Sequence, residues 1–99
     1  MKVEVLASVM NASSLRETVQ HMNLQSDAVI INQCDRLGQE EMQISQENGE
    51  ARTIRFYSFQ DRGIGRSRNE AILRAEGDIC LFSDADIVYE DGYETAILA

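Results

Sequence analysis

Two short apolar segments separated by a helical pattern constrain the fold of this 99-residue chain more than any other feature. Residues 3–9 are almost entirely apolar, and residues 27–32 form a second apolar run bounded by polar residues. Continuous apolar runs of this length are typical of strands buried on both faces of a parallel sheet. Between them Ser14 and Glu17 form a capping-box pattern, which predicts a helix over residues 14–22. The order strand, helix, strand indicates a βαβ unit.

The remaining segments extend this pattern into an α/β fold. Residues 34–51 are polar, and we expect a solvated excursion there with at most one short strand or turn. Residues 52–59 alternate in polarity and predict a third strand. A helix over residues 64–75, a strand over residues 78–82 and the start of another helix near the end of the chain complete the pattern. The expected fold is a Rossmann-like, mostly parallel sheet flanked by helices, in a single domain over the whole chain.

Composition excludes several functions. The net charge of −8 and the pI near 4.5 argue against general binding to nucleic acid or to anionic lipid. The first residues lack the long apolar run of a signal peptide or membrane span. Cys34 and Cys80 have no metal-type spacing, and Cys80 is interpreted as a small core residue. A reducing, cytoplasmic setting fits best, with a peripheral position at the inner face of the membrane left open.

An acidic pair, Asp84 and Asp86, follows the apolar residues 79–82. Two carboxylates this close together repel each other unless a cation lies between them and a partner. Hard oxygen ligands at the carboxyl end of a strand are suited to Mg²⁺ or Mn²⁺. The alternative is that the two aspartates cap a turn, as most such pairs do.

Arg68 lies on the face of the predicted second helix that we expect to turn toward the sheet. That face consists of Ile64, Arg68, Ala71, Ile72 and Ala75. An inward guanidinium requires an anionic or planar partner, which a phosphate, a pyrimidine edge or an aspartate would supply. An internal ion pair from Arg68 to Asp84 or Asp61 is an equally open interpretation.

Glycine and polar residues near the other helix and strand ends indicate ligand binding less strongly. Gly63 and Gly65 flank the start of the second helix, and a plain turn is favoured there over a phosphate-binding loop. Arg66 and Arg74 are expected to face solvent. At the end of the second strand, Asn32 and Gln33 either read a base by hydrogen bonds or cap the strand.

The order of these motifs resembles the central signature of family 2 glycosyltransferases. The matching motifs are Asp61-x-Gly63, Ser67-Arg68-Asn69-x-Ala71, Ala75-x-Gly77-Asp78 and Asp84-x-Asp86. Asn11 is also similar to an asparagine that follows the first strand in this family, with Ser8 standing where the family has proline. The sequence departs from the family at the second strand, where Asn32-Gln33-Cys34-Asp35 replaces the usual Asp-Asp-Gly-Ser.

The resemblance implies the nucleotide-binding half of a GT-A fold and sugar transfer from a nucleoside diphosphate donor, with a UDP-sugar favoured, in polysaccharide biosynthesis. It implies nucleotide binding by Ser8, Asn11, Gln33, Arg68 and Asp84, and Mn²⁺ or Mg²⁺ binding by Asp84 and Asp86. The family's catalytic base lies well beyond the acidic motif, so we expect no catalytic residue here. We interpret the chain as the N-terminal part of such a domain, truncated after the motif, with exposed sheet edges that favour self-association.

Two other functions remain open. A non-catalytic nucleotide-binding or protein-interaction module on the same scaffold is favoured by the altered end of the second strand. A metal-dependent nucleotidyltransferase ranks last, because residues 7–14 contain neither the glycine nor the lysine expected after its first strand.

Overall fold

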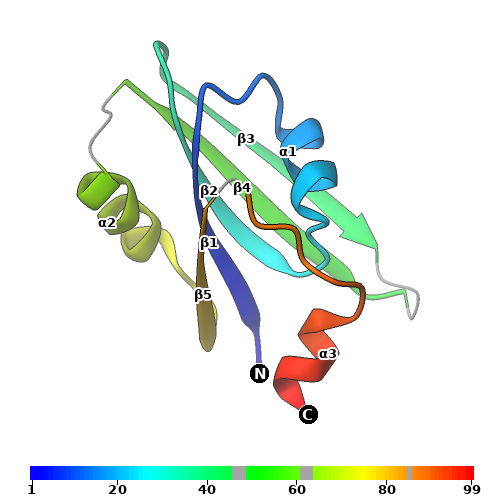
Figure 1. Ribbon diagram of the computed structural model, residues 1–99. Coiled ribbons are helices and arrows are strands. Elements are labelled where there is room, and N and C mark those ends of the chain that lie inside the picture. Colours follow the sequence, from blue (N-terminus) through cyan, green and yellow to red (C-terminus); the bar gives the residue numbers. More distant parts are fainter. Residues whose placement is uncertain (46–48, 61–63, 85) are drawn as a thin grey trace.

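A computed structural model describes residues 1–45, 49–60, 64–84 and 86–99 of the chain, apart from the side chains of residues 64 and 65 (Figure 1). The elements in chain order are β1 (Val3–Met10), α1 (Leu15–Met22), β2 (Asp27–Gln33), β3 (Gly38–Ser45), β4 (Ala51–Phe59), α2 (Ile64–Arg74), β5 (Ile79–Asp84) and α3 (Tyr93–Leu98). The strands form one sheet in the order β3-β4-β2-β1-β5.

Helices cover both faces of this sheet (Figure 1). On one face, α1 and the first residue of α3 pack on apolar side chains of β1, β2 and β4. On the other face, Ala71 of α2 packs against Leu6, Val29 and Ile31. The central strands β1 and β2 are therefore buried on both sides, as their continuous apolar runs predicted. The expected α/β architecture is confirmed.

Strand pairing is parallel between β1 and β2, β1 and β5, and β2 and β4, while β3 is antiparallel to β4. The side chains of β3 are mostly exposed, as expected for a solvated segment, but the expectation of at most one short strand was wrong, because β3 is eight residues long. Only Met42 and Ile44 of β3 pack partly against the core. The backbone ladder to β4 therefore holds a strand whose side chains are mostly exposed, and such a strand has little apolar signal in its sequence.

The start of α1 follows its sequence signal with one difference. Ser14 is the N-cap, and its hydroxyl accepts a hydrogen bond from the Glu17 backbone N–H at 3.1 Å. The Glu17 carboxylate accepts from the hydroxyl of Ser13 at 2.5 Å. The first turn of α1 is thus fixed by two serines.

Two residues lie elsewhere than expected. Cys80 is exposed, because β5 is an edge strand whose outer side no described element covers. Arg74 does not face solvent freely: its guanidinium lies over the rings of Tyr57 and Phe59, at 4.6 and 5.2 Å from their centroids, and pairs with Glu70. A long arginine stem at the end of α2 covers aromatic rings that would otherwise be exposed.

Candidate functional site

The parallel strands end at one edge of the sheet and bring the polar residues there together. Ser8 of β1 is in register with Asp84, the last residue of β5. Met10 of β1 is in register with Gln33 of β2, which in turn is in register with Phe59 of β4. In open α/β sheets ligands bind at the carboxyl ends of the strands, so this is the edge at which a site is expected.

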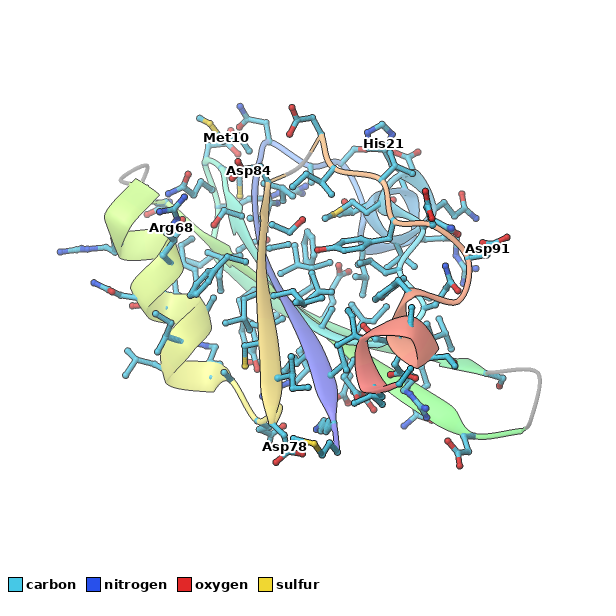
Figure 2. The ribbon with its side chains drawn as sticks, turned by 60° about the horizontal axis from the view of Figure 1, so that its bottom comes forward. Met10, His21, Arg68, Asp78, Asp84 and Asp91 are labelled. Atoms are coloured by element: carbon cyan, nitrogen blue, oxygen red, sulfur yellow. The ribbon has the colours of Figure 1, made fainter. Side chains whose placement is uncertain are left out.

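Ser8, Arg68 and Asp84 line one small cavity of about 70 Å³ at this edge. Figure 2 shows Asp84 at the end of β5 and Arg68 on the neighbouring part of α2, whereas Asp78 lies at the opposite end of β5. Asp84 and Arg68 are both exposed, and within the described ranges neither forms an ion pair. The expected alternative of an internal pair between them is therefore wrong, and its counterpart with Asp61 lies outside the described residues.

A second cavity of about 240 Å³ is lined by residues other than those of the first. Apolar residues such as Ile31 and Phe59 contribute its walls, and its polar lining residues are Gln33, Gln60, Arg66, Ser67 and Glu70. The linings of the two cavities are linked by a hydrogen bond of 2.9 Å between the hydroxyl of Ser8 in the first and the hydroxyl of Ser67 in the second. The two cavities together present serine, glutamine and arginine side chains beside two carboxylates, Asp84 in the first cavity and Glu70, which pairs with Arg74, in the second.

Ser67 was not expected to take part in this site. The sequence pattern placed Arg68 on the inward stripe of α2, but Ser67 and Ala71 are the residues that face the sheet, at 2% and 1% exposure. Ile72, expected inside, is 51% exposed. Small side chains let α2 lie close to the sheet, so the buried stripe is rotated by about one residue from the apolar one. The i, i+4 pair of small residues was the signal available in the sequence.

The remaining predicted residues that the structure describes are not among those that line these two cavities. Asn11 has a left-handed backbone (φ 51°), and its N–H donates to the Gln33 carbonyl at 2.8 Å. Its side chain lines a different hollow, on the α1 side of the sheet beside Met10 and His21. Asp86 is exposed in the turn after β5. Gly65 lies inside the first turn of α2, whereas Gly63 is outside the described residues.

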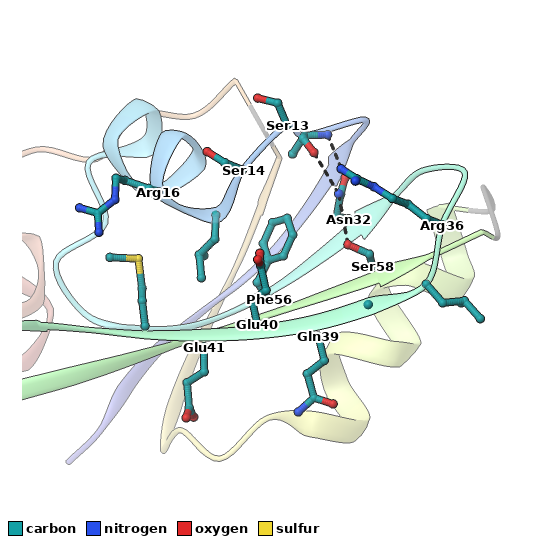
Figure 3. A pocket seen from close by; sticks show the side chains of 15 residues that line it. Ser13, Ser14, Arg16, Asn32, Arg36, Gln39, Glu40, Glu41, Phe56 and Ser58 are labelled. Atoms are coloured by element: carbon teal, nitrogen blue, oxygen red, sulfur yellow. Dashed lines mark hydrogen bonds between the residues drawn. The ribbon is translucent and has the colours of Figure 1, made fainter.

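A larger cavity of about 770 Å³ lies between the N-terminus of α1 and β3 (Figure 3). Asn32 lies at its inner wall with every polar atom bonded. Its Oδ1 accepts from the Ala12 N–H at 3.0 Å, and its Nδ2 donates to the Ala12 carbonyl at 3.3 Å and to the Ser58 hydroxyl at 3.4 Å. Of the two interpretations for this residue, the geometry favours the one in which it fixes the strand end and the following loop.

The donor set at the carboxyl edge suits a hard divalent cation. Asp84 and Asp86 offer carboxylate oxygens, which Mg²⁺ and Mn²⁺ prefer. Among the described residues no group of three or more histidine, cysteine, aspartate or glutamate side chains comes together. Two carboxylates fit an ion that takes its other ligands from substrate phosphates and water, and they do not form a complete protein cage.

Residues 5–98 match the family described as Glycosyl transferase family 2. The chain belongs to glycosyltransferase family 2. This family 2 domain has the fold that the resemblance implied, and the cavities described above lie at the edge where its acidic motif ends β5. No curated protein and no solved structure matches the chain significantly. In the described part of this family 2 domain, no helix is both long and apolar enough to cross a membrane.

Proposed function

We propose that this domain binds a nucleoside diphosphate sugar, a UDP-sugar in the first instance, through a divalent ion at Asp84 and Asp86. The observation that supports it is the shared cavity of Ser8, Arg68 and Asp84 in a family 2 domain, where Ser8 is hydrogen-bonded to Ser67 of the second cavity. Open space beside unpaired charges is what a phosphate and a cation require.

In this proposal different side chains bind different parts of the nucleotide-sugar donor. Arg68 binds a phosphate oxygen or the edge of the base with its planar guanidinium. Gln33 and Ser8 offer hydrogen bonds to base and ribose, and the backbone of Asn11 fixes the Gln33 strand end. A bound divalent ion supplies positive charge against the leaving diphosphate. The acceptor and the catalytic base are not among the residues assigned here.

A non-catalytic module on the same scaffold is the second candidate. It is favoured by Asn32, whose two amide N–H groups already donate to the Ala12 carbonyl and the Ser58 hydroxyl and so are not available to donate to a base. This candidate predicts nucleotide or protein binding that does not depend on a metal.

Titration calorimetry with UDP and with GDP, each with and without Mn²⁺, tests the proposal. We expect nucleotide binding that requires Mn²⁺ and that is weaker in Asp84→Asn and in Asp86→Asn. The loss of affinity should exceed roughly tenfold, which is the effect of changing a residue that supports a metal ligand without binding the metal itself. Asp78→Asn is the matched control, because it makes the same change at the opposite end of β5 (Figure 2) and should bind as the wild type does. Nucleotide binding that is indifferent to Mn²⁺ would favour the non-catalytic module. No nucleotide binding at all would refute the proposed function and the nucleotide-binding form of the second candidate.

A further inference from the structure

The segment that follows Asp86 is held by the turn after α1. The Tyr89 N–H donates to the Met22 carbonyl at 2.9 Å, and the Asn23 side-chain amide donates to the Tyr89 carbonyl at 2.9 Å. Gln25 holds the next residues from both sides: its Nε2 donates to the Glu90 carbonyl at 3.1 Å, and its Oε1 accepts from the Gly92 N–H at 2.9 Å. We call the side chains of Asn23 and Gln25 the clamp.

Asp86 therefore lies in a short connection that is fixed at both ends. On one side Asp84 belongs to β5 and pairs with β1. On the other side the clamp holds the backbone from Tyr89 onward. Four residues, 85–88, join the two, and four residues span about 14 Å at most. Fixing both ends of so short a segment leaves the Asp86 carboxylate a small range of positions.

We propose that Asn23 and Gln25 are positioning residues for the metal carboxylate Asp86, an inference that rests on the proposed function. Neither residue lies on the strand or helix that carries the site, and both act through the backbone of residues 89–92. A carboxylate that is already held near its bound position loses less conformational freedom when an ion binds. Residues that orient metal ligands in this way affect metal affinity without touching the metal.

The backbone at Asn23 provides a clean way to remove the clamp. Asn23 has a left-handed conformation with φ 54° and ψ 49°, which glycine adopts without strain. Asn23→Gly therefore deletes the amide while keeping the turn, and Gln25→Ala deletes the second pair of hydrogen bonds. Gln25→Ala alone is a milder variant in case the double variant does not fold.

Arg52→Ala provides a matched control. The Arg52 guanidinium forms hydrogen bonds with Glu94 of α3 at 2.8 to 3.2 Å. Its loss loosens α3 immediately beyond the clamped segment but leaves the clamp intact. A general loosening of the C-terminal segment would therefore affect the control and the clamp variants alike.

The experiment measures Mn²⁺ affinity in the presence of UDP, together with amide hydrogen exchange of residues 86–92 without metal. We expect Asn23→Gly/Gln25→Ala to weaken Mn²⁺ binding by about tenfold and to speed exchange in this segment, and Arg52→Ala to bind as the wild type does. Equal affinity in clamp variants and wild type, or an equal loss in the control, overturns the inference while leaving the proposed function standing. A wild-type protein that binds no Mn²⁺ with UDP overturns both.

Discussion

Tyr93 is the residue that attaches α3 to the rest of the molecule. Its side chain is 8% exposed, and its phenol oxygen accepts from the backbone N–H groups of Gln25 and Ser26, both at 3.0 Å. The hydroxyl also shares a hydrogen bond of 2.7 Å with the Ser26 side chain. Burial raises the pKa of this phenol above its ordinary value of 10.0, and the hydrogen bonds oppose the shift only in part.

Tyr93→Phe should therefore change both the stability and its pH dependence. Because the folded state has the higher pKa, the protonated phenol contributes stability that is fully present below pH 10 and is lost as the pH rises through the raised pKa. We expect the variant to lose about 2 kcal/mol near neutral pH and to show a shallower alkaline decline. Urea unfolding between pH 7 and pH 11 measures both effects, with Tyr89→Phe as the control. An unchanged alkaline slope in Tyr93→Phe would contradict the assignment.

At the scale of elements, the turn between α2 and β5 depends on close packing against β1. The buried Glu4 carboxylate accepts from the backbone N–H groups of Glu76 and Gly77, at 2.7 and 3.1 Å, and pairs with Arg55 at 3.3 Å. A Cβ at Gly77 would lie 2.6 Å from the Glu4 Cβ. This contact at the amino end of the sheet holds the C-terminal end of the helix that carries Ser67 and Arg68 at the other end.

Gly77→Ala should destabilise the protein by about 1–3 kcal/mol, because its methyl group cannot fit without moving β1 or the turn. Gly38→Ala is the control, since a Cβ there would approach nothing closer than 4.0 Å, the Ser58 Cβ, and should be neutral or slightly stabilising. Denaturant unfolding of both variants measures the free energy of unfolding of each. A Gly77→Ala protein as stable as the Gly38→Ala protein would show that the turn is free to move.

At the scale of the whole molecule, the two edges of the sheet differ in charge. The outer strand β3 has Glu40 and Glu41, which discourage pairing with another chain. On β5 the Ile79 N–H points to β1, where it donates to the Lys2 carbonyl at 3.0 Å, so the alternate residues Cys80 and Phe82 point their backbone groups outward. Phe82 is 53% exposed. Residues 79–83 of β5 carry no charged side chain, and only Asp84 at the end of the strand does, so an edge with outward backbone groups here favours pairing with a second copy of the chain.

We therefore expect concentration-dependent dimers through β5. Since each copy has a net charge of −8, dimerisation should strengthen as salt screens their repulsion. Phe82→Lys should suppress it, whereas Gln43→Lys at an exposed position of β3 should not. Sedimentation velocity at low and high salt measures the effect. A wild-type protein that stays monomeric at high concentration in both conditions would contradict this expectation.

The sequence by itself determined the elements whose side chains carry strong local patterns. The apolar runs of β1 and β2, the cap of α1 and the spacing of the family motifs all follow from contacts or propensities local to their own segments. The common edge of Ser8 and Asp84 followed as well, because parallel strands must end at the same edge, whereas Arg68 lies on α2 and its place beside them did not follow from the strand pattern.

Only the tertiary structure decided features that depend on a partner far away in the chain. β3 exists because β4 offers a backbone ladder, and Cys80 is exposed because β5 lies at an edge. The apolar periodicity of α2 predicted the wrong buried face, and the contact of Ser67 with Ser8 on the sheet decides between that face and the one with the small residues. The clamp joins residues more than sixty positions apart. In each case the deciding free energy comes from packing or pairing across the fold, which a single segment of sequence does not contain.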